Sequence, residues 1–217
     1  MRAHDFDRET CQAVDWMLAY LAATPRHGIC YRRDGRGTCY LHDSGGYNIN
    51  KGQRPIIAWV DANWGDRDLC RRSMSGYVFI MSGGPISWRC RKLPMVTRST
   101  AESELVALDE GVREALHVRT LGMEVGIQGA DCIPVMEDNQ AATNLATGTP
   151  PGDRLKHVDV KFFAVQEDQA EGKVSVEKVA SKNNLADIFT KALGRMKFAF
   201  LRGCMGVVQA GATAEQA

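Results

Sequence analysis

Hydrophobic residues recur along this chain in two patterns, and each pattern occupies its own stretch. Residues 8–24 place Val14, Met17, Leu18 and Leu21 at the spacing of one helix face. From residue 55 onward, short runs rich in β-branched and aromatic residues follow one another between turn residues. These runs are IIAWVDAN, GYVFIMSG and PISWRC. They predict three strands joined as an antiparallel meander.

The second half of the chain alternates between helix and strand patterns. Residues 98–126 carry a long apolar stripe at helical spacing, which predicts one long helix. CIPVME and KVSVEKV predict two more strands, whereas NQAATNLAT, HVDVKFFAVQEDQAEG and NNLADIFTKAL predict helices, the last capped by Asn183 or Asn184. The order indicates an α/β fold, with a mixed five-stranded sheet flanked by helices.

Three segments follow from these patterns. Residues 1–54 form an N-terminal helix and hairpin with a polar, glycine-rich loop, residues 55–195 form the sheet domain, and residues 196–217 form a short C-terminal helix and a disordered tail.

Composition narrows the class of protein only slightly. The 217 residues carry a net charge of +1, so any nucleic-acid surface must be local. No apolar run reaches the ~20 residues of a membrane span. Seven cysteines without a CxxC motif favour a reducing compartment, and we expect a cytoplasmic protein.

Two histidines and two cysteines near the N-terminus have a spacing that resembles a zinc site. His27 and Cys30 precede Cys39 and His42 across DGRG, a hairpin turn signal. Side-chain alternation in that hairpin separates His42 from the cysteines, so the pattern favours a hairpin over a zinc site.

Acidic residues stand at the ends of the predicted sheet elements. Asp61 ends the first strand, Glu104 lies in the first turns of the long helix, Asp138 ends the fourth strand, and Asp187 begins the last helix. A carboxylate at such a partly buried position is costly unless it is paired or bound to metal. The alternative at the end of the fourth strand is that Asp138 or Asn139 only caps the helix that follows. Oxygen ligands without cysteine or histidine point to Mg²⁺, with Mn²⁺ as a substitute.

Five blocks in one order carry a family resemblance. They are VDANWGDRDLCRRSMSGYVFIMSGGPISWRCRK, STAESELVAL, MEDNQAA, KHVDVKFF and NNLADIFTKAL. Together they resemble the ribonuclease H domain of copia-type retrotransposon Pol polyproteins, and the segment before them resembles the connection to reverse transcriptase.

The resemblance implies a two-metal hydrolase that cuts the RNA strand of RNA–DNA hybrids. Its metal ligands and catalytic residues would be Asp61, Glu104, Asp138 and Asp187. Glu104 would serve the leaving-group side and Asp187 the water-activating side, and Glu102 remains a rival for Glu104. Asp66, Asp68 and Glu137 are interpreted as solvated neighbours. The reverse-transcriptase domain of the same polyprotein is a further expected partner, and the nucleus or retrotransposon particles are alternative locations.

Departures from the family pattern leave two alternatives open. Asn63, Leu105 and Phe163 stand where relatives carry aspartate, tyrosine and histidine. A catalytically decayed nucleic-acid-binding or connecting module of the same fold is therefore the main alternative. A DNA strand-transfer enzyme, which usually needs only three acids, is the other.

A basic stretch precedes the long helix. Residues 87–99 contain Arg89, Arg91, Lys92 and Arg98 without an acidic residue, and Trp88 lies among them. The stretch predicts a phosphate-binding surface near the acids, with an ordinary solvated strand end as the alternative.

Overall fold

The computed structural model describes residues 8–32, 55–64, 72–97, 99–127, 129–148 and 159–210, with side chains in the last range from residue 163. Within these ranges one mixed sheet has the strand order β4-β3-β2-β5-β6. Its strands are β2 (Ile56–Asn63), β3 (Met74–Met81), β4 (Gly84–Lys92), β5 (Ile133–Glu137) and β6 (Val174–Lys178). β2, β3 and β4 are antiparallel, whereas β5 runs parallel to β2 and β6 parallel to β5. The predicted fold class is confirmed.

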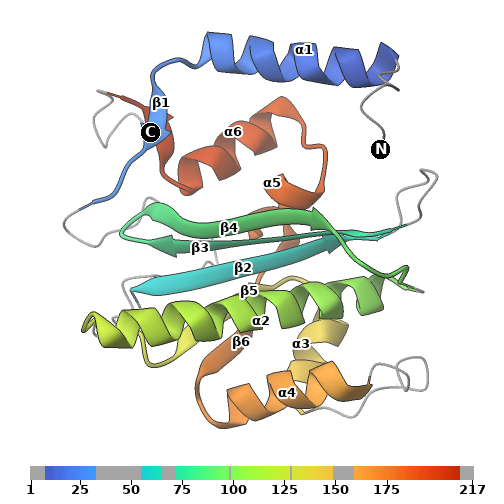
Figure 1. Ribbon diagram of the computed structural model, residues 1–217, viewed down its shortest axis with the longest axis vertical. Coiled ribbons are helices and arrows are strands. Elements are labelled where there is room, and N and C mark those ends of the chain that lie inside the picture. Colours follow the sequence, from blue (N-terminus) through green and yellow to red (C-terminus); the bar gives the residue numbers. More distant parts are fainter. Residues whose placement is uncertain are drawn as a thin grey trace.

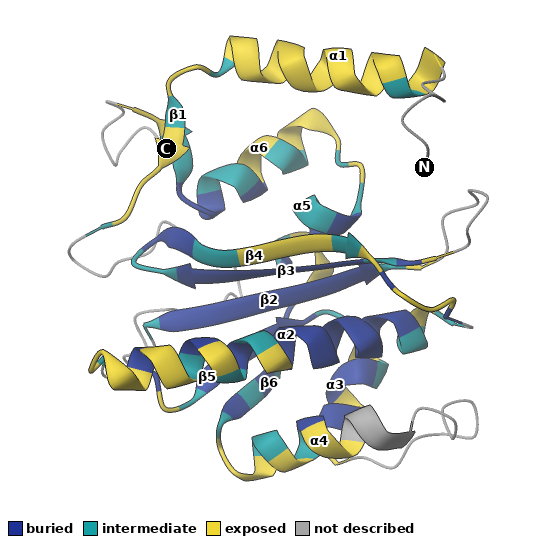
Figure 2. Ribbon diagram, viewed as in Figure 1, coloured by how far each residue is buried: buried dark blue, intermediate teal, exposed yellow. Residues whose placement is uncertain are grey.

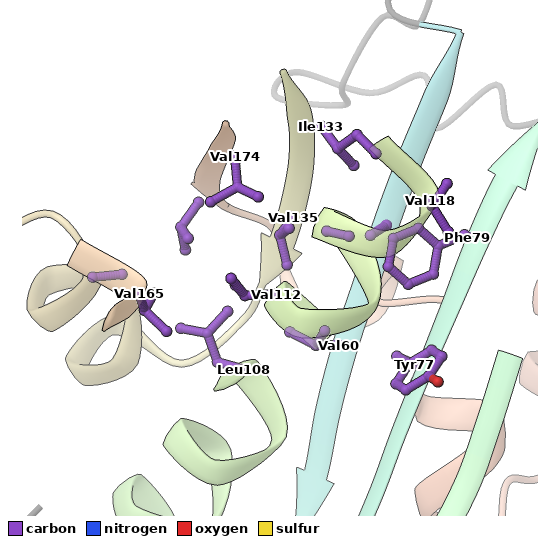
Figure 3. Packing of buried hydrophobic residues seen from close by; sticks show 14 of the residues in the cluster. Val60, Tyr77, Phe79, Leu108, Val112, Val118, Ile133, Val135, Val165 and Val174 are labelled. Atoms are coloured by element: carbon purple, nitrogen blue, oxygen red, sulfur yellow. The ribbon is translucent and has the colours of Figure 1, made fainter. Parts of the chain in front are cut away.

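Helices cover both faces of this sheet (Figure 1). On one face lie α2 (Thr100–Glu124), α3 (Gln140–Ala146) and α4 (Asp159–Ala170), and on the other lie α5 (Asp187–Thr190) and α6 (Arg195–Cys204). Because side chains alternate along each strand, β2 contributes buried residues to the cores on both faces of the sheet. Val60 faces α2 in the core drawn in Figure 3, and Ala58 belongs to the same cluster. Ile57 and Trp59 belong to the cluster on the other face, with residues of α6.

The second face of the sheet is closed by the C-terminal part of the described chain. Leu201 and Cys204 of α6 are buried against Ile57 and Trp59 of β2. The predicted boundary at residue 195 leaves α6 outside the sheet domain, although α6 packs into the same core.

The last predicted helix is shorter than its sequence pattern indicates. A 3₁₀ turn, η2 (Ser181–Asn183), and the four-residue α5 replace a continuous helix over residues 183–193. Lys191 ends α5 in an extended conformation, with φ −127° and ψ 143°. The predicted cap by Asn183 or Asn184 is wrong, because the N-cap of α5 is Ala186, which makes no side-chain capping hydrogen bond. Asn184 instead lies at the end of η2, where its Oδ1 accepts from the amide of Ala186 at 3.0 Å.

Two glycines let a helix approach the sheet from each side. A Cβ atom on Gly111 of α2 would overlap the Val60 side chain of β2. A Cβ atom on Gly76 of β3 would lie 2.7 Å from Cβ of Phe189 in α5. Both helices therefore lie closer to the strands than a larger residue would allow.

The N-terminal helix α1 (Arg8–Ala23) forms as predicted, but none of its residues is buried (Figure 2). The apolar stripe that predicts it is exposed, including Met17 and Leu21. Tyr20 makes an edge-to-face contact with Phe198 of α6, with ring centroids 5.6 Å apart.

Beyond α1 the chain pairs with the far end of the described sequence. β1 (His27–Ile29) pairs antiparallel with β7 (Val207–Gln209), so residues predicted as one arm of a hairpin pair with the C-terminal region. Residues 33–42 of that hairpin, which include Cys39 and His42 of the rejected zinc arrangement, lie outside the described residues, as do the glycine-rich loop and the end of the C-terminal tail. Among the described helices, none combines the length and the apolar character needed to cross a membrane.

Candidate metal centre

Asp61 lies near the end of β2, on the face of the sheet that α5 covers. Its side chain is fully buried because α5 and the residues after it close over this strand end. The Thr190 hydroxyl donates to Oδ2 of Asp61, and the Lys191 ammonium donates to Oδ1 at 2.9 Å. Asn184 holds the same segment to β2 by donating from its side-chain amide to the Val60 carbonyl at 2.8 Å.

Glu104 reaches the same strand end from α2. Ser99 caps this helix, accepting from the amide of Glu102 at 3.1 Å. One turn later Glu104 is buried, and its Oε2 accepts from the amide of Ala62 at 2.7 Å. Helix geometry therefore directs Glu104 toward Asp61 and leaves Glu102 in the capping turn.

Asp138 follows β5 directly and is not the helix cap. Asn139 is the N-cap of α3, because its Oδ1 accepts from the amides of Ala141 and Ala142 at 2.9 and 3.2 Å. Asp138 instead joins Asp61 and Glu104, and one carboxylate oxygen from each lies within 4.8 Å of the others. The structure thus brings together three of the four predicted ligands as one cluster.

Asp187, the fourth predicted ligand, is held by lysines. Lys191 donates to Oδ1 of Asp187, and Lys197 of α6 donates to Oδ2. Because Lys191 also contacts Asp61, its ammonium links the two carboxylates. The sequence analysis missed these lysines, although the four-residue spacing from Asp187 to Lys191 was a visible signal.

Crowding of the acids perturbs their protonation. Burial raises the pKa of Glu104 to about 8, and the negative charges of Asp61 and Asp138 contribute to the rise. Burial also raises the pKa of Asp61 to about 6, although Lys191 and Thr190 oppose the change. Burial acts to lower the pKa of Lys191, but the carboxylates of Asp61 and Asp187 outweigh it and raise that pKa above its ordinary value.

The interpretation of Glu137 as a solvated residue is wrong. Glu137 is 0% exposed, on the face of β5 that also carries Ile133 and Val135. Its Oε1 accepts from the amide of Asn139 at 2.8 Å, and its Oε2 is a buried atom without a hydrogen-bond partner. Burial raises the pKa of Glu137 well above its ordinary value, with Glu104 contributing. Asp66 and Asp68 lie outside the described residues.

The predicted basic stretch divides between the two faces of β4. Arg91 forms an ion pair with Glu110 of α2, using Nε at 3.1 Å and Nη2. Arg89, also on this face, lies opposite Tyr77 of β3. Trp88 and Lys92 lie on the face toward α5, both exposed, and Arg98 is outside the described residues.

The ion pair of Arg91 leads to a stability prediction. Arg91→Gln should lower the free energy of unfolding by about 1–3 kcal/mol, because buried Glu110 loses its charged partner. Arg113→Gln removes a more exposed ion pair with Asp109, so it should lower the free energy of unfolding by only about 0.5 kcal/mol. Urea unfolding of the two variants measures the difference. Equal losses would mean that the Arg91 pair acts as a surface pair.

The donor set of the cluster fits a divalent cation. Asp61, Glu104 and Asp138 offer only carboxylate oxygens, which hard cations such as Mg²⁺ and Mn²⁺ prefer. A positive ion at this position would also offset the repulsion that raises the pKa of Glu104. The cluster is therefore a candidate metal centre.

The strand order and the acids at the ends of β2 and β5 and on α2 agree with the ribonuclease H-type domain that the resemblance implies. Its homologues are Pol polyproteins of copia-type retrotransposons, which confirms the resemblance found in the sequence.

Two relatives illustrate this homology. The chain is 30% identical over 202 residues to the retrovirus-related Pol polyprotein from transposon TNT 1-94 of Nicotiana tabacum, covering 92% of this chain and 14% of the relative. It is also 30% identical over 202 residues to the corresponding polyprotein from transposon RE1 of Arabidopsis thaliana, covering 93% of this chain and 13% of the relative. The chain therefore spans about a seventh of the length of these relatives. No family model matches it.

Solved structures similar to this chain include LC11-RNase H1, isolated from compost by a metagenomic approach. Its TM-score is 0.48 at 18% identity, with 63% of this chain and 93% of that chain covered. LC11-RNase H1 in complex with an RNA/DNA hybrid gives a TM-score of 0.43 at 18% identity, with 62% and 93% covered.

Proposed function

We propose that this chain is a metal-dependent endonuclease that hydrolyses the RNA strand of RNA–DNA hybrids. One observation carries the proposal: three elements distant in sequence, β2, α2 and the end of β5, bring carboxylate oxygens within 4.8 Å of one another. Folding such a cluster costs free energy through repulsion and burial, which a binding function offsets. The homology to retrotransposon Pol polyproteins supports the ribonuclease H type of this function.

The residues of this chain have separate roles in the proposal. Asp61, Glu104 and Asp138 hold the ion, and Asp187 lies beside Asp61 to complete the acid set. The amide of Ala62 fixes one oxygen of Glu104, and Asn139 caps α3 so that the Asp138 carboxylate is left for the cluster. Bound Mg²⁺ or Mn²⁺ supplies a Lewis acid for the phosphate and a more acidic water.

We propose an RNA–DNA hybrid as the partner, bound beside the acids at the edge strand β4. Trp88 and Lys92 are exposed on the edge strand β4, where a backbone phosphate can approach. A protein distinguishes hybrids by groove shape and 2′-hydroxyls, so we expect no base-sequence selectivity. The reverse-transcriptase domain of a longer polyprotein remains a proposed second partner.

A metal titration provides the first test. Mg²⁺ or Mn²⁺ up to roughly 10 mM should raise the melting temperature by about 5–10 °C, since ions that bind only the folded state stabilise it. EDTA should reverse the shift. Glu104→Gln should lose most of it, whereas Glu102→Gln should retain it, because Glu104 belongs to the cluster and Glu102 to the capping turn.

The outcome of this titration also weighs the alternatives. A melting temperature that does not respond to either ion would favour the decayed, non-catalytic module. A response accompanied by cleavage of duplex DNA in place of hybrid would favour the strand-transfer class.

A further inference from the structure

The ammonium of Lys191 lies between two of the proposed metal ligands. Its Nζ is 2.9 Å from Oδ1 of Asp61 and also donates to Oδ1 of Asp187. Lys191 follows α5 with an extended backbone, so the helix ends directly before this residue. A single positive group therefore links two of the carboxylates that the family resemblance implies as metal ligands.

The remaining oxygens of both carboxylates are also engaged. The Thr190 hydroxyl donates to Oδ2 of Asp61, and Lys197 donates to Oδ2 of Asp187. Asp187 thus receives an ammonium group on each oxygen, and both lysines are partly shielded, with 35% and 38% of their side chains exposed. These contacts balance the charge of Asp187 without a metal ion. In the cluster of Asp61, Glu104 and Asp138, the ammonium of Lys191 pairs with Asp61.

We propose that Lys191 serves as a built-in cation at the position between Asp61 and Asp187. The chain then binds one divalent ion tightly at Asp61, Glu104 and Asp138, and it binds a second ion only when Lys191 is displaced. This inference rests on the proposed function for the identity of the first ion. It differs from the two-ion arrangement that the family resemblance implies, because Lys191 competes with the second ion.

Counting bound ions tests this directly. Isothermal titration of the full chain with Mn²⁺ should give one tight site per chain, with a second site weaker by about tenfold or more. In Lys191→Met, which keeps the length of the side chain but removes its charge, the second site should tighten by about tenfold. Adding Asp187→Asn to this variant should abolish the gain, since the second ion would lose a ligand.

A matched control uses another ion-paired lysine. Lys173 pairs with Asp168 and Glu171 at the turn before β6, so Lys173→Met should leave the Mn²⁺ isotherm unchanged. Melting curves in EDTA and in Mn²⁺ provide a second readout. Lys191→Met should be less stable than the parent in EDTA and should gain more from Mn²⁺, because two carboxylates have lost their internal cation.

The outcomes separate this inference from the proposed function. Two Mn²⁺ sites of equal affinity in the parent, unchanged in Lys191→Met, would overturn the role of Lys191 while leaving the nuclease proposal intact. One tight site in a parent that cleaves no hybrid, with a second site that tightens in Lys191→Met, would support the role of Lys191 and contradict the nuclease proposal. One site in both the parent and Lys191→Met would overturn the role of Lys191.

Discussion

Replacing Asp138 with asparagine is expected to reduce cleavage of an RNA–DNA hybrid by about two orders of magnitude or more. The substitution keeps the shape of the side chain but removes one negative charge from the cluster with Asp61 and Glu104. Stability should change by less than about 1 kcal/mol, because the cap of α3 is Asn139 and stays in place. Binding of the hybrid in EDTA should hold or tighten slightly, since one charge that repels phosphate has gone.

The measurement is cleavage of a labelled hybrid in Mn²⁺, with duplex DNA and duplex RNA alongside. Asp131→Asn is the control, because Asp131 is exposed in the turn before β5, outside the three-acid cluster. Cleavage by Asp138→Asn at the parental rate would return Asp138 to a structural role. A parent that cuts none of the substrates would instead support the decayed module.

Without metal, the protein should lose stability as the pH rises from 5 to 8. Glu104 has a pKa of about 8 in the folded chain against an ordinary value of 4.5, and Asp61 about 6 against 3.8. The folded state therefore binds more protons than the unfolded state in this range, and the free energy of unfolding falls as the pH rises. One excess proton held across the range corresponds to roughly 4 kcal/mol. The effect is complete once the pH passes the folded pKa of Glu104.

Urea unfolding in EDTA at several pH values measures this slope. Mn²⁺ should flatten or reverse it, because ions bind the deprotonated carboxylates of the folded state. Glu104→Gln should also reduce the slope, since glutamine does not titrate. The pKa of Glu110 is lowered, because Arg91 and Ser75 outweigh its burial, so Glu110 affects stability only at more acidic pH. Stability that is independent of pH from 5 to 8 in EDTA would contradict the crowding of the acids.

The strand and helix patterns predict most of this fold because the sheet is covered on both faces. The apolar runs of β2 and β3 are continuous, and the polar residues at their ends mark where each strand reaches solvent or the acid cluster. The same logic places Asp61 and Asp138 at neighbouring strand ends, since β5 runs parallel to β2. The stripe on α2 likewise indicates that Glu104 lies within the helix that packs beneath β2.

Other features depend on contacts between distant segments. Glu137 is adjacent to Asp138 in sequence, yet alternation along β5 directs it to the opposite face, under α2 and α3. The pairing of β1 with β7 joins residues about 180 positions apart, and local turn signals instead favour a hairpin. The run of basic residues predicts one surface, but side chains alternate across β4, and Arg91 pairs with Glu110 of α2.

Two glycines outside the acid set act as spacers for it. Gly111 lets α2 lie against Val60, two turns of helix after Glu104, and Gly76 lies directly opposite Asp61 in the sheet, beneath α5. The distance between Glu104 and Asp61 therefore depends on how closely α2 and α5 pack against the strands, away from the acids themselves. A larger residue at Gly111 or Gly76 should therefore change the spacing of the acids while every carboxylate in the site stays the same.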